Sequence, residues 1–83
     1  MTLYVQMTKP NNGYACDKEA AKLLDPLQYY EVSDVDMGSS STTIYLESNR
    51  FGYNSVNFTF YKLIDGKLEE YDIFSDPEYN PYL

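Results

Sequence analysis

The chain contains thirteen carboxylates and six basic residues but no histidine among its 83 residues. Histidine is the commonest general base near neutral pH and the commonest metal ligand, so its absence removes the usual basis of both kinds of site. Two carboxylate pairs remain for general acid–base chemistry, Glu69–Glu70 and Asp34/Asp36. Because apolar residues alternate with the two aspartates, we expect both aspartates to point to solvent. A solvated face is therefore favoured over a catalytic dyad.

The other residues of chemical interest also favour a protein that is not an enzyme. Cys16 is the only cysteine, which excludes an internal disulfide and is typical of a reducing compartment. Soft metal sites need several cysteines or histidines, and the segment 34–38 is only a fragment of a calcium loop. The four glycines are isolated, so no phosphate-binding loop is present. We expect no catalytic residues, no cofactor and no metal site.

The net charge of -7 on such a short chain favours basic partners. Direct nucleic-acid binding is disfavoured, because the six basic residues are scattered and phosphate contacts need clustered cations. The first five residues lack the basic start and apolar run of a signal peptide, and no stretch approaches the roughly 20 apolar residues of a membrane span. We expect a soluble protein of the cytoplasm that binds no membrane.

The acidic residues are concentrated toward the C-terminus, where tyrosines are interleaved with them. Carboxylates spaced along a strand and tail resemble the charge pattern of a nucleic-acid backbone, and tyrosines are common anchors at interfaces. The predicted partner-binding residues are Glu69, Glu70, Tyr71, Asp72, Asp76, Glu78, Tyr79 and Tyr82, with Asp34, Asp36 and Glu47 as a second patch. The alternative is that these acids only keep a small protein soluble.

Patterns along the chain predict the elements that position these residues. Alternation of apolar and polar residues predicts strands at residues 2–8, 42–47 and 56–61. Residues 28–37 also read as a strand, with a bulge near Ser33–Asp34 that keeps its apolar residues on one side. Asp65-Gly66 is a strong hairpin signal and predicts a last strand over residues 67–74. A short helix is expected over 17–24, with Asp17 as its cap and Ala20, Leu23 and Leu24 on one face.

These elements form a single small domain of mainly β class, with an irregular acidic tail over about residues 75–83. Five short strands with frequent turn signals and one small helix predict a strongly bent antiparallel sheet or a small barrel. An SH3-like barrel is the first choice, and a flat sheet with the helix on one face is the second.

The chain resembles small proteins encoded by phages and prophages of Gram-positive bacteria in the segment from Lys22-Leu23-Leu24 through Tyr29-Tyr30-Glu31-Val32 and in three further segments. The first is the run Val35-Asp36-Met37-Gly38-Ser39-Ser40-Ser41-Thr42-Thr43-Ile44-Tyr45-Leu46. The second is Tyr53-Asn54-Ser55-Val56-Asn57-Phe58-Thr59-Phe60, which departs from the pattern at Tyr53, where phenylalanine is expected. The third is the ending Asn80-Pro81-Tyr82-Leu83. These motifs are structural, and the resemblance transfers no catalytic residues.

The resemblance implies a class of function. Small acidic phage proteins are often inhibitors of host defence, such as anti-CRISPR proteins and restriction inhibitors, which act by occupying a binding site. The first hypothesis is therefore an inhibitor that binds a CRISPR effector nuclease or another nucleic-acid enzyme. The second is a structural or assembly module of a phage, which binds through its tyrosine-rich sheet or an edge strand. Neither the target nor the oligomeric state follows from the sequence.

Overall fold

The computed structural model describes residues 2–83 as one antiparallel sheet with a single short α-helix. The elements, which include two 3₁₀ turns named η1 and η2, follow in the order β1 (Leu3–Met7), α1 (Ala15–Ala21), β2 (Tyr29–Met37), β3 (Thr42–Leu46), β4 (Gly52–Asn54), η1 (Ser55–Asn57), β5 (Phe58–Ile64), β6 (Lys67–Glu70) and η2 (Ile73–Ser75). The strands lie in the order β4-β3-β2-β1-β5-β6, and every pair is antiparallel. The mainly β class is confirmed.

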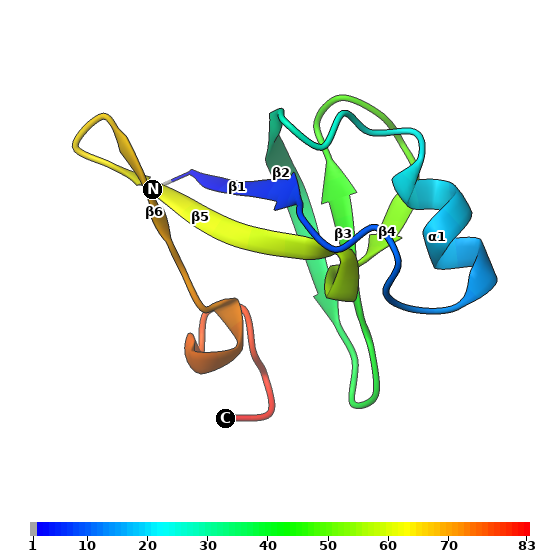
Figure 1. Ribbon diagram of the computed structural model, residues 1–83. Helices are drawn as coiled ribbons and strands as arrows, with labels where there is room; N and C mark the ends of the chain where they lie inside the picture. The colour runs from blue at the N-terminus through cyan, green and yellow to red at the C-terminus, as the bar shows by residue number, and fades with distance from the viewer. Residues whose placement is uncertain (1) are drawn as a thin grey trace.

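The sheet is strongly bent but open. Strands β1 and β5 cross the molecule at a steep angle to β3 and β4 (Figure 1). The long strand β2 belongs to both halves, because it pairs with β1 through its first residues and with β3 through its last. Within residues 2–83, the two edge strands β4 and β6 do not pair with each other, so the sheet does not close. Of the predicted architectures, the bent sheet is therefore correct, and the SH3-like barrel and the flat sheet are not.

The predicted bulge is present where β2 changes partner. The β2–β3 register shifts between Val32 and Asp34, which leaves Ser33 as the extra residue. Because side chains alternate along a strand, one extra residue restores Val35 and Met37 to the side occupied by Val32. All three are partly buried against the core.

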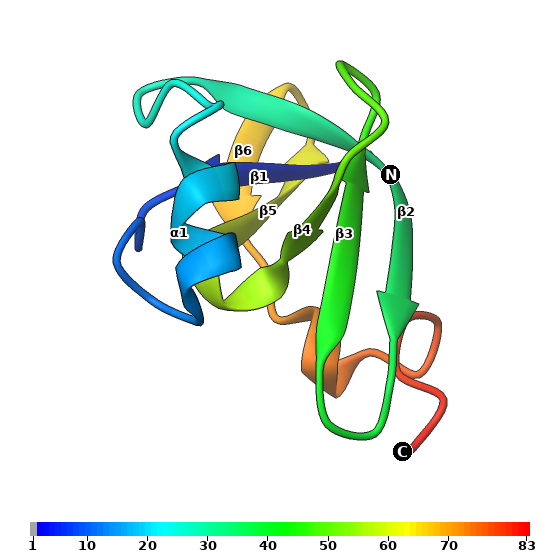
Figure 2. The ribbon, with the colours of Figure 1, turned by 90° about the vertical axis from the view of Figure 1, so that its right-hand side faces the viewer.

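The core fills the inner side of the bend. Its buried residues are Leu3, Val5, Met7, Ala21, Leu24, Ile44, Leu46, Tyr53, Phe58, Phe60 and Ile73. Helix α1 lies beside β4 at one end of the sheet, and the C-terminal segment runs below the other end toward the β2–β3 hairpin (Figure 2). Thus the inner face is covered from both ends, while the outer face of the strands stays open to solvent.

The helix differs from its prediction in start and in face. It begins at Ala15, and Asp17 occupies its third position, where the carboxylate accepts a hydrogen bond of 2.8 Å from the Tyr14 N–H. Asp17 therefore does cap the helix, but from its third position, as one partner of a capping box with the N-cap residue Tyr14. The buried side chains are Ala21 and Leu24, whereas Leu23 is 61 % exposed, because the chain leaves the helix after Ala21.

Two strand predictions were also wrong in their limits. The segment 52–57 contains the unexpected short strand β4 and the turn η1, so Val56 is exposed instead of lying inward on a strand. The last strand ends at Glu70, four residues early, and Ile73 enters the core from η2. The hairpin between β5 and β6 is confirmed: Asp65 and Gly66 both have positive φ, at 50° and 80°.

We predict that replacing Ile73 by alanine lowers the free energy of unfolding by about 2–5 kcal/mol, because a fully buried isoleucine leaves a cavity. Leu27→Ala is the matched control. Leu27 is 83 % exposed, so its removal should cost under about 0.5 kcal/mol. Urea unfolding of both variants measures the difference, and equal stabilities would contradict the burial of η2.

Candidate functional site

A row of acidic and aromatic side chains crosses four strands on the side of the sheet away from the core. The register pairs Tyr4 of β1 with Glu31 of β2 and with Tyr61 of β5, and it pairs Tyr61 with Glu70 of β6. Directly opposed residues of antiparallel strands project to the same side. The result is a continuous line, Glu70–Tyr61–Tyr4–Glu31, with a carboxylate at each end and two tyrosines between them.

The tyrosines of this row contact their neighbours. Tyr29 packs edge-on against Tyr61, with ring centroids 5.2 Å apart and an angle of 82° between the rings. The Tyr4 hydroxyl donates a long hydrogen bond of 3.5 Å to a Glu31 carboxylate oxygen. Burial raises the pKa of Tyr61, and the nearby Tyr29 and Glu70 raise it further. The Tyr61 hydroxyl therefore stays protonated near neutral pH.

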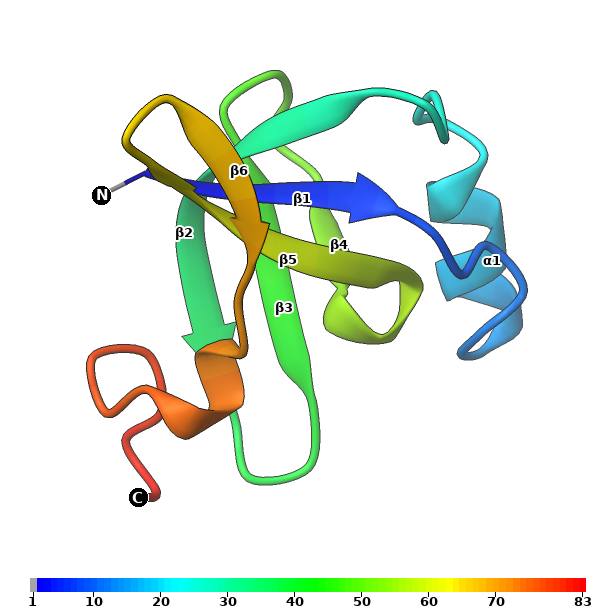
Figure 3. The same cartoon turned by 60° about the vertical axis from the view of Figure 1, so that its left-hand side comes forward.

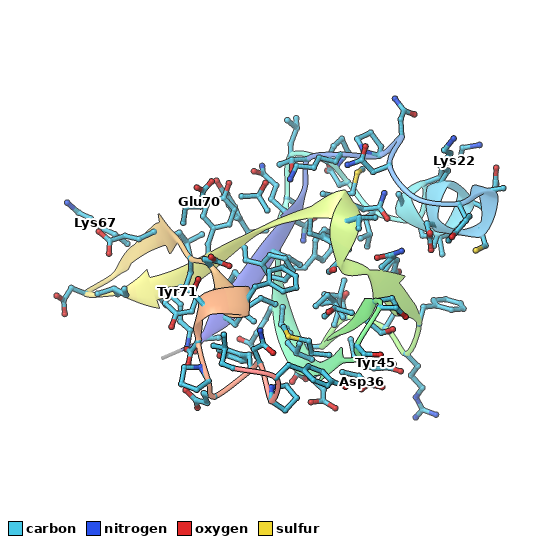
Figure 4. All side chains as sticks on the ribbon, turned by 90° about the horizontal axis from the view of Figure 1, so that it is seen from below. Lys22, Asp36, Tyr45, Lys67, Glu70 and Tyr71 are labelled. Carbon is cyan, nitrogen blue, oxygen red and sulfur yellow. The ribbon has the colours of Figure 1, made fainter. Side chains whose placement is uncertain are left out.

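The same side of the sheet continues past the bulge. Asp34 lies opposite Tyr45 of β3, and Asp36 lies two pairs further along, opposite Thr43 (Figure 4). Glu47 follows β3, and its N–H donates a 3.0 Å hydrogen bond to the Glu31 carbonyl, which joins the two halves. We call this surface the outer face; its acidic and aromatic residues are Tyr4, Tyr29, Glu31, Asp34, Asp36, Tyr45, Glu47, Tyr61 and Glu70. Within the six described strands, lysine and arginine occupy no outward position.

The C-terminal tyrosines lie on the opposite side, around a buried lysine. Lys62 points inward from β5 and is only 4 % exposed. Its ammonium group lies 5.1 Å from the ring centroid of Tyr71 and 4.9 Å from that of Tyr79, within range of cation–π attraction. The Tyr71 hydroxyl donates a short hydrogen bond to Asp76. We call Lys62, Tyr71, Asp76 and Tyr79 the lysine cluster, because it holds the C-terminal segment against the sheet.

The hydrogen bond between Tyr71 and Asp76 shifts the pKa of both side chains. The bond to Asp76 is the main reason that the pKa of Tyr71 rises from 10.0 to about 12, with burial and nearby acids adding to it. In the other direction, the Tyr71 hydroxyl is the main cause that lowers the pKa of Asp76, helped by the Glu78 N–H and by Lys62. A neutral tyrosine and an ionised aspartate therefore persist together across the neutral pH range.

The predicted site residues therefore divide into groups. Asp34, Asp36, Glu47 and Glu70 come together on the outer face. Tyr71, Asp76 and Tyr79 belong to the lysine cluster. Asp72 caps η2, where its carboxylate accepts hydrogen bonds from the Phe74 N–H at 2.9 Å and the Ser75 hydroxyl at 2.7 Å.

The remaining three predicted residues are separate from these groups. Glu69 is exposed on β6 beside the Lys62 position, on the inward side of the strand. Glu78 shares a small cavity of about 350 Å³ with Asp34, so the tail meets β2 at the bulge. Tyr82 is 63 % exposed and lines a separate groove.

Sequence reasoning missed Glu31 and the four tyrosines of the outer face. The alternation of Tyr4 with Leu3 and Val5, and of Tyr61 with Phe60, already placed both tyrosines outward. What the alternation left open was the strand order. Only the neighbour relations β2–β1–β5–β6 bring residues that are distant in sequence into one row.

Two further findings concern the part of the chain that the structure describes. Across residues 2–83, no group of three or more cysteines, aspartates and glutamates is arranged to hold a metal ion. In the same range, the helices are too short and too polar to cross a membrane.

Comparison with known proteins identifies the family. The family model described as bacteriophage T4 protein Y07B matches residues 2–83. The chain belongs to this family. A relative in the Y07B family, the uncharacterized 11.2 kDa protein in the segB-ipI intergenic region of Enterobacteria phage T4, is 38 % identical over 81 residues, which cover 93 % of this chain and 85 % of that protein. No solved structure matches the chain.

Membership of the Y07B family confirms the phage character that the resemblance implied. The Gram-positive origin gains no support, since this relative comes from a phage of enterobacteria.

The lysine cluster yields a prediction about pH. In Tyr71→Phe the hydrogen bond to Asp76 is lost. Because the folded-state pKa of Asp76 is lowered, the stability it contributes is present above the ordinary value of 3.8 and is lost as pH falls through the folded value. Because the folded-state pKa of Tyr71 is raised, its contribution is present below 10.0 and is lost as pH rises toward about 12. The stability gap between wild type and variant should therefore be widest between these limits.

Urea unfolding across a pH series measures this gap. Tyr79→Phe is the control, because it keeps a ring over Lys62 and leaves the Tyr71–Asp76 bond intact. A gap for Tyr71→Phe that stays constant from strong acid to strong base would contradict the assigned hydrogen bond.

Proposed function

We propose that this phage protein is a non-enzymatic inhibitor that binds a basic, nucleic-acid-handling surface of a host protein through its outer face. It acts in the host cytoplasm by occupying the surface, and it needs no cofactor, metal ion or membrane. The specific form of the proposal is an anti-CRISPR protein whose target is a CRISPR effector nuclease. Other nucleic-acid enzymes with a basic groove are targets of the same chemical kind.

The observation that carries the proposal is the row Glu70–Tyr61–Tyr4–Glu31. A lysine or arginine that lies over a tyrosine ring gains cation–π attraction, and arginine also forms paired hydrogen bonds with a carboxylate. The row offers both kinds of contact side by side on paired strands. Surfaces that bind nucleic acid present arginine and lysine at high density, so they carry the complementary chemistry.

The overall electrostatics support the same kind of partner. A net charge of -7 accelerates the encounter with a basic surface. Nucleic acid is attracted to the same basic surface, so the protein and the nucleic acid compete for one site. The outer face is also pre-organised, because its residues stand on paired strands, Tyr29 packs against Tyr61, and Tyr4 is hydrogen-bonded to Glu31. Little side-chain freedom is lost on binding, which favours affinity.

The proposal places the binding surface differently from the sequence prediction. Asp72, Asp76, Tyr71 and Tyr79 contact their own chain in η2 and the lysine cluster, so they contribute shape and stability. Asp34, Asp36, Glu47 and Glu70 contribute charge directly on the outer face. Glu78 extends the acidic surface beside Asp34 at the bulge.

Direct binding to purified CRISPR effector nucleases tests the proposal, with a pull-down from an enterobacterial lysate beside it. We expect one basic nucleic-acid enzyme to be captured, to lose DNA or guide binding, and to be released as salt rises toward about 0.5 M, where charge attraction is largely screened. Capture of phage structural proteins alone would instead favour the assembly-module hypothesis. A complex that is equally tight at low and high salt would contradict the electrostatic basis.

Matched charge variants locate the surface. The outer-face variant combines Glu31→Gln, Asp36→Asn and Glu70→Gln. The control combines Glu19→Gln, Asp25→Asn and Asp65→Asn, which removes the same charge from other parts of the surface. We expect the outer-face variant to bind about tenfold or more weakly and the control to lose less than about threefold. Equal losses would show that net charge alone, and not the outer face, determines binding.

A further inference from the structure

Two apolar side chains outside the outer face are displayed to solvent from the two 3₁₀ turns. Val56 of η1 is 43 % exposed and Phe74 of η2 is 44 % exposed. Turn η1 contacts β3, whereas η2 follows the end of β6 (Figure 3). The β2–β3 turn lines the same hollow as Val56 and Phe74. Val56 and Phe74 line two adjoining hollows of about 850 Å³ and 490 Å³, and both hollows also include Ser55. We call the combined depression the apolar groove.

The backbones of Val56 and Phe74 are held by the same arrangement of side chains. The Val56 N–H donates to the Asn54 side chain at 3.2 Å, and the Val56 carbonyl accepts from the Asn12 side chain at 3.1 Å. Likewise, the Phe74 N–H donates to Asp72 at 2.9 Å, and the Phe74 carbonyl accepts from the Asn80 side chain at 2.8 Å.

Each exposed apolar side chain therefore stands on a residue whose N–H and carbonyl are both hydrogen-bonded to side chains. Rigid apolar anchors of this kind reduce the entropy lost on binding. Exposed apolar groups with a polar surround are also typical of interaction sites.

Two exposed tyrosines also line the groove. Tyr14, which is 81 % exposed, and Tyr82, which is 63 % exposed, line its wider hollow. The narrower hollow has charge at its margin, where Glu70 and Asp72 outnumber Lys9. The groove thus combines exposed apolar and aromatic side chains, set among serines and asparagines, with a net negative end.

Charge decides between the two kinds of occupant. A second copy of this chain would bring another net charge of -7 to an already acidic margin, which opposes association. A segment with a lysine or arginine next to apolar side chains satisfies both ends of the groove, because its cation faces Glu70 and Asp72 while its apolar groups contact Val56 and Phe74.

We propose that the apolar groove is a second interaction site, which binds a segment of a partner protein that carries apolar side chains next to a lysine or arginine. The site goes beyond the inhibitor proposal, because its anchors are Val56 and Phe74 and it shares only Glu70 with the outer face. This chain can thus bind a basic surface through its outer face and a neighbouring segment of a partner through the groove.

Selection from a library of random twelve-residue peptides, displayed on filamentous phage, tests the groove with the full chain as bait. We expect enriched peptides to combine aromatic or aliphatic residues with lysine or arginine. Synthetic versions should bind Val56→Ser and Phe74→Ser at least tenfold more weakly than wild type. Failure to enrich any peptide, or enrichment of peptides without basic residues, would overturn the proposal.

Variants separate this site from the outer face. Glu31→Gln with Asp36→Asn should leave peptide binding within threefold of wild type, while Glu70→Gln should weaken it. Phe74 also packs against Phe60, with ring centroids 6.4 Å apart, so Val56→Ser serves as the second test if Phe74→Ser unfolds. If the outer-face pair abolishes peptide binding and Val56→Ser does not, the peptides bind the outer face and the groove proposal fails.

Discussion

The fold depends on one constraint, which is that β2 must serve two halves of a bent sheet while keeping one side toward the core. Its first residues pair with β1 and its last with β3. An uninterrupted strand could not turn Val32, Val35 and Met37 to the same side, because a shift of one residue reverses every side chain. The bulge at Ser33 removes this conflict. It also keeps Glu31 and Asp36 on the outer face, so core and acidic surface arise from the same irregularity.

The lysine cluster plays a comparable role for the C-terminal segment. Carboxylates and tyrosines in a tail suggest a binding surface when only composition is considered. Here Tyr71 and Tyr79 cover the buried Lys62, and Asp76 holds Tyr71. Burying a lysine without nearby attraction is costly, so the aromatic rings and the acid compensate for the lost water. Three of the residues predicted to bind a partner thus also stabilise a buried charge within the protein.

Local patterns were sufficient for features that depend on neighbouring residues. The alternation in β1 and β3, the offset at Ser33–Asp34 and the Asp65-Gly66 turn all have short-range causes, and each prediction is confirmed. Val56 and Ile73 were misassigned because hydrogen bonds from remote or capping side chains form 3₁₀ turns. At Val56 alternation predicted a strand, and at Ile73 the hairpin signal did. Likewise, the outer face could not be assembled from the sequence, since the row Glu70–Tyr61–Tyr4–Glu31 depends on strand order.

The position of β1 at the centre of the sheet has a consequence for folding. Its two neighbours are β2, which follows soon after, and β5, which begins only at Phe58. During synthesis the first strand therefore lacks one of its partners until most of the chain has left the ribosome. The β2–β3–β4 meander closes through short loops, whereas β1 with β5 requires a long one, and long-range pairing of this kind is slow. We therefore expect the pairing of β1 with β5 at the centre of this sheet to form late, although β1 is made early.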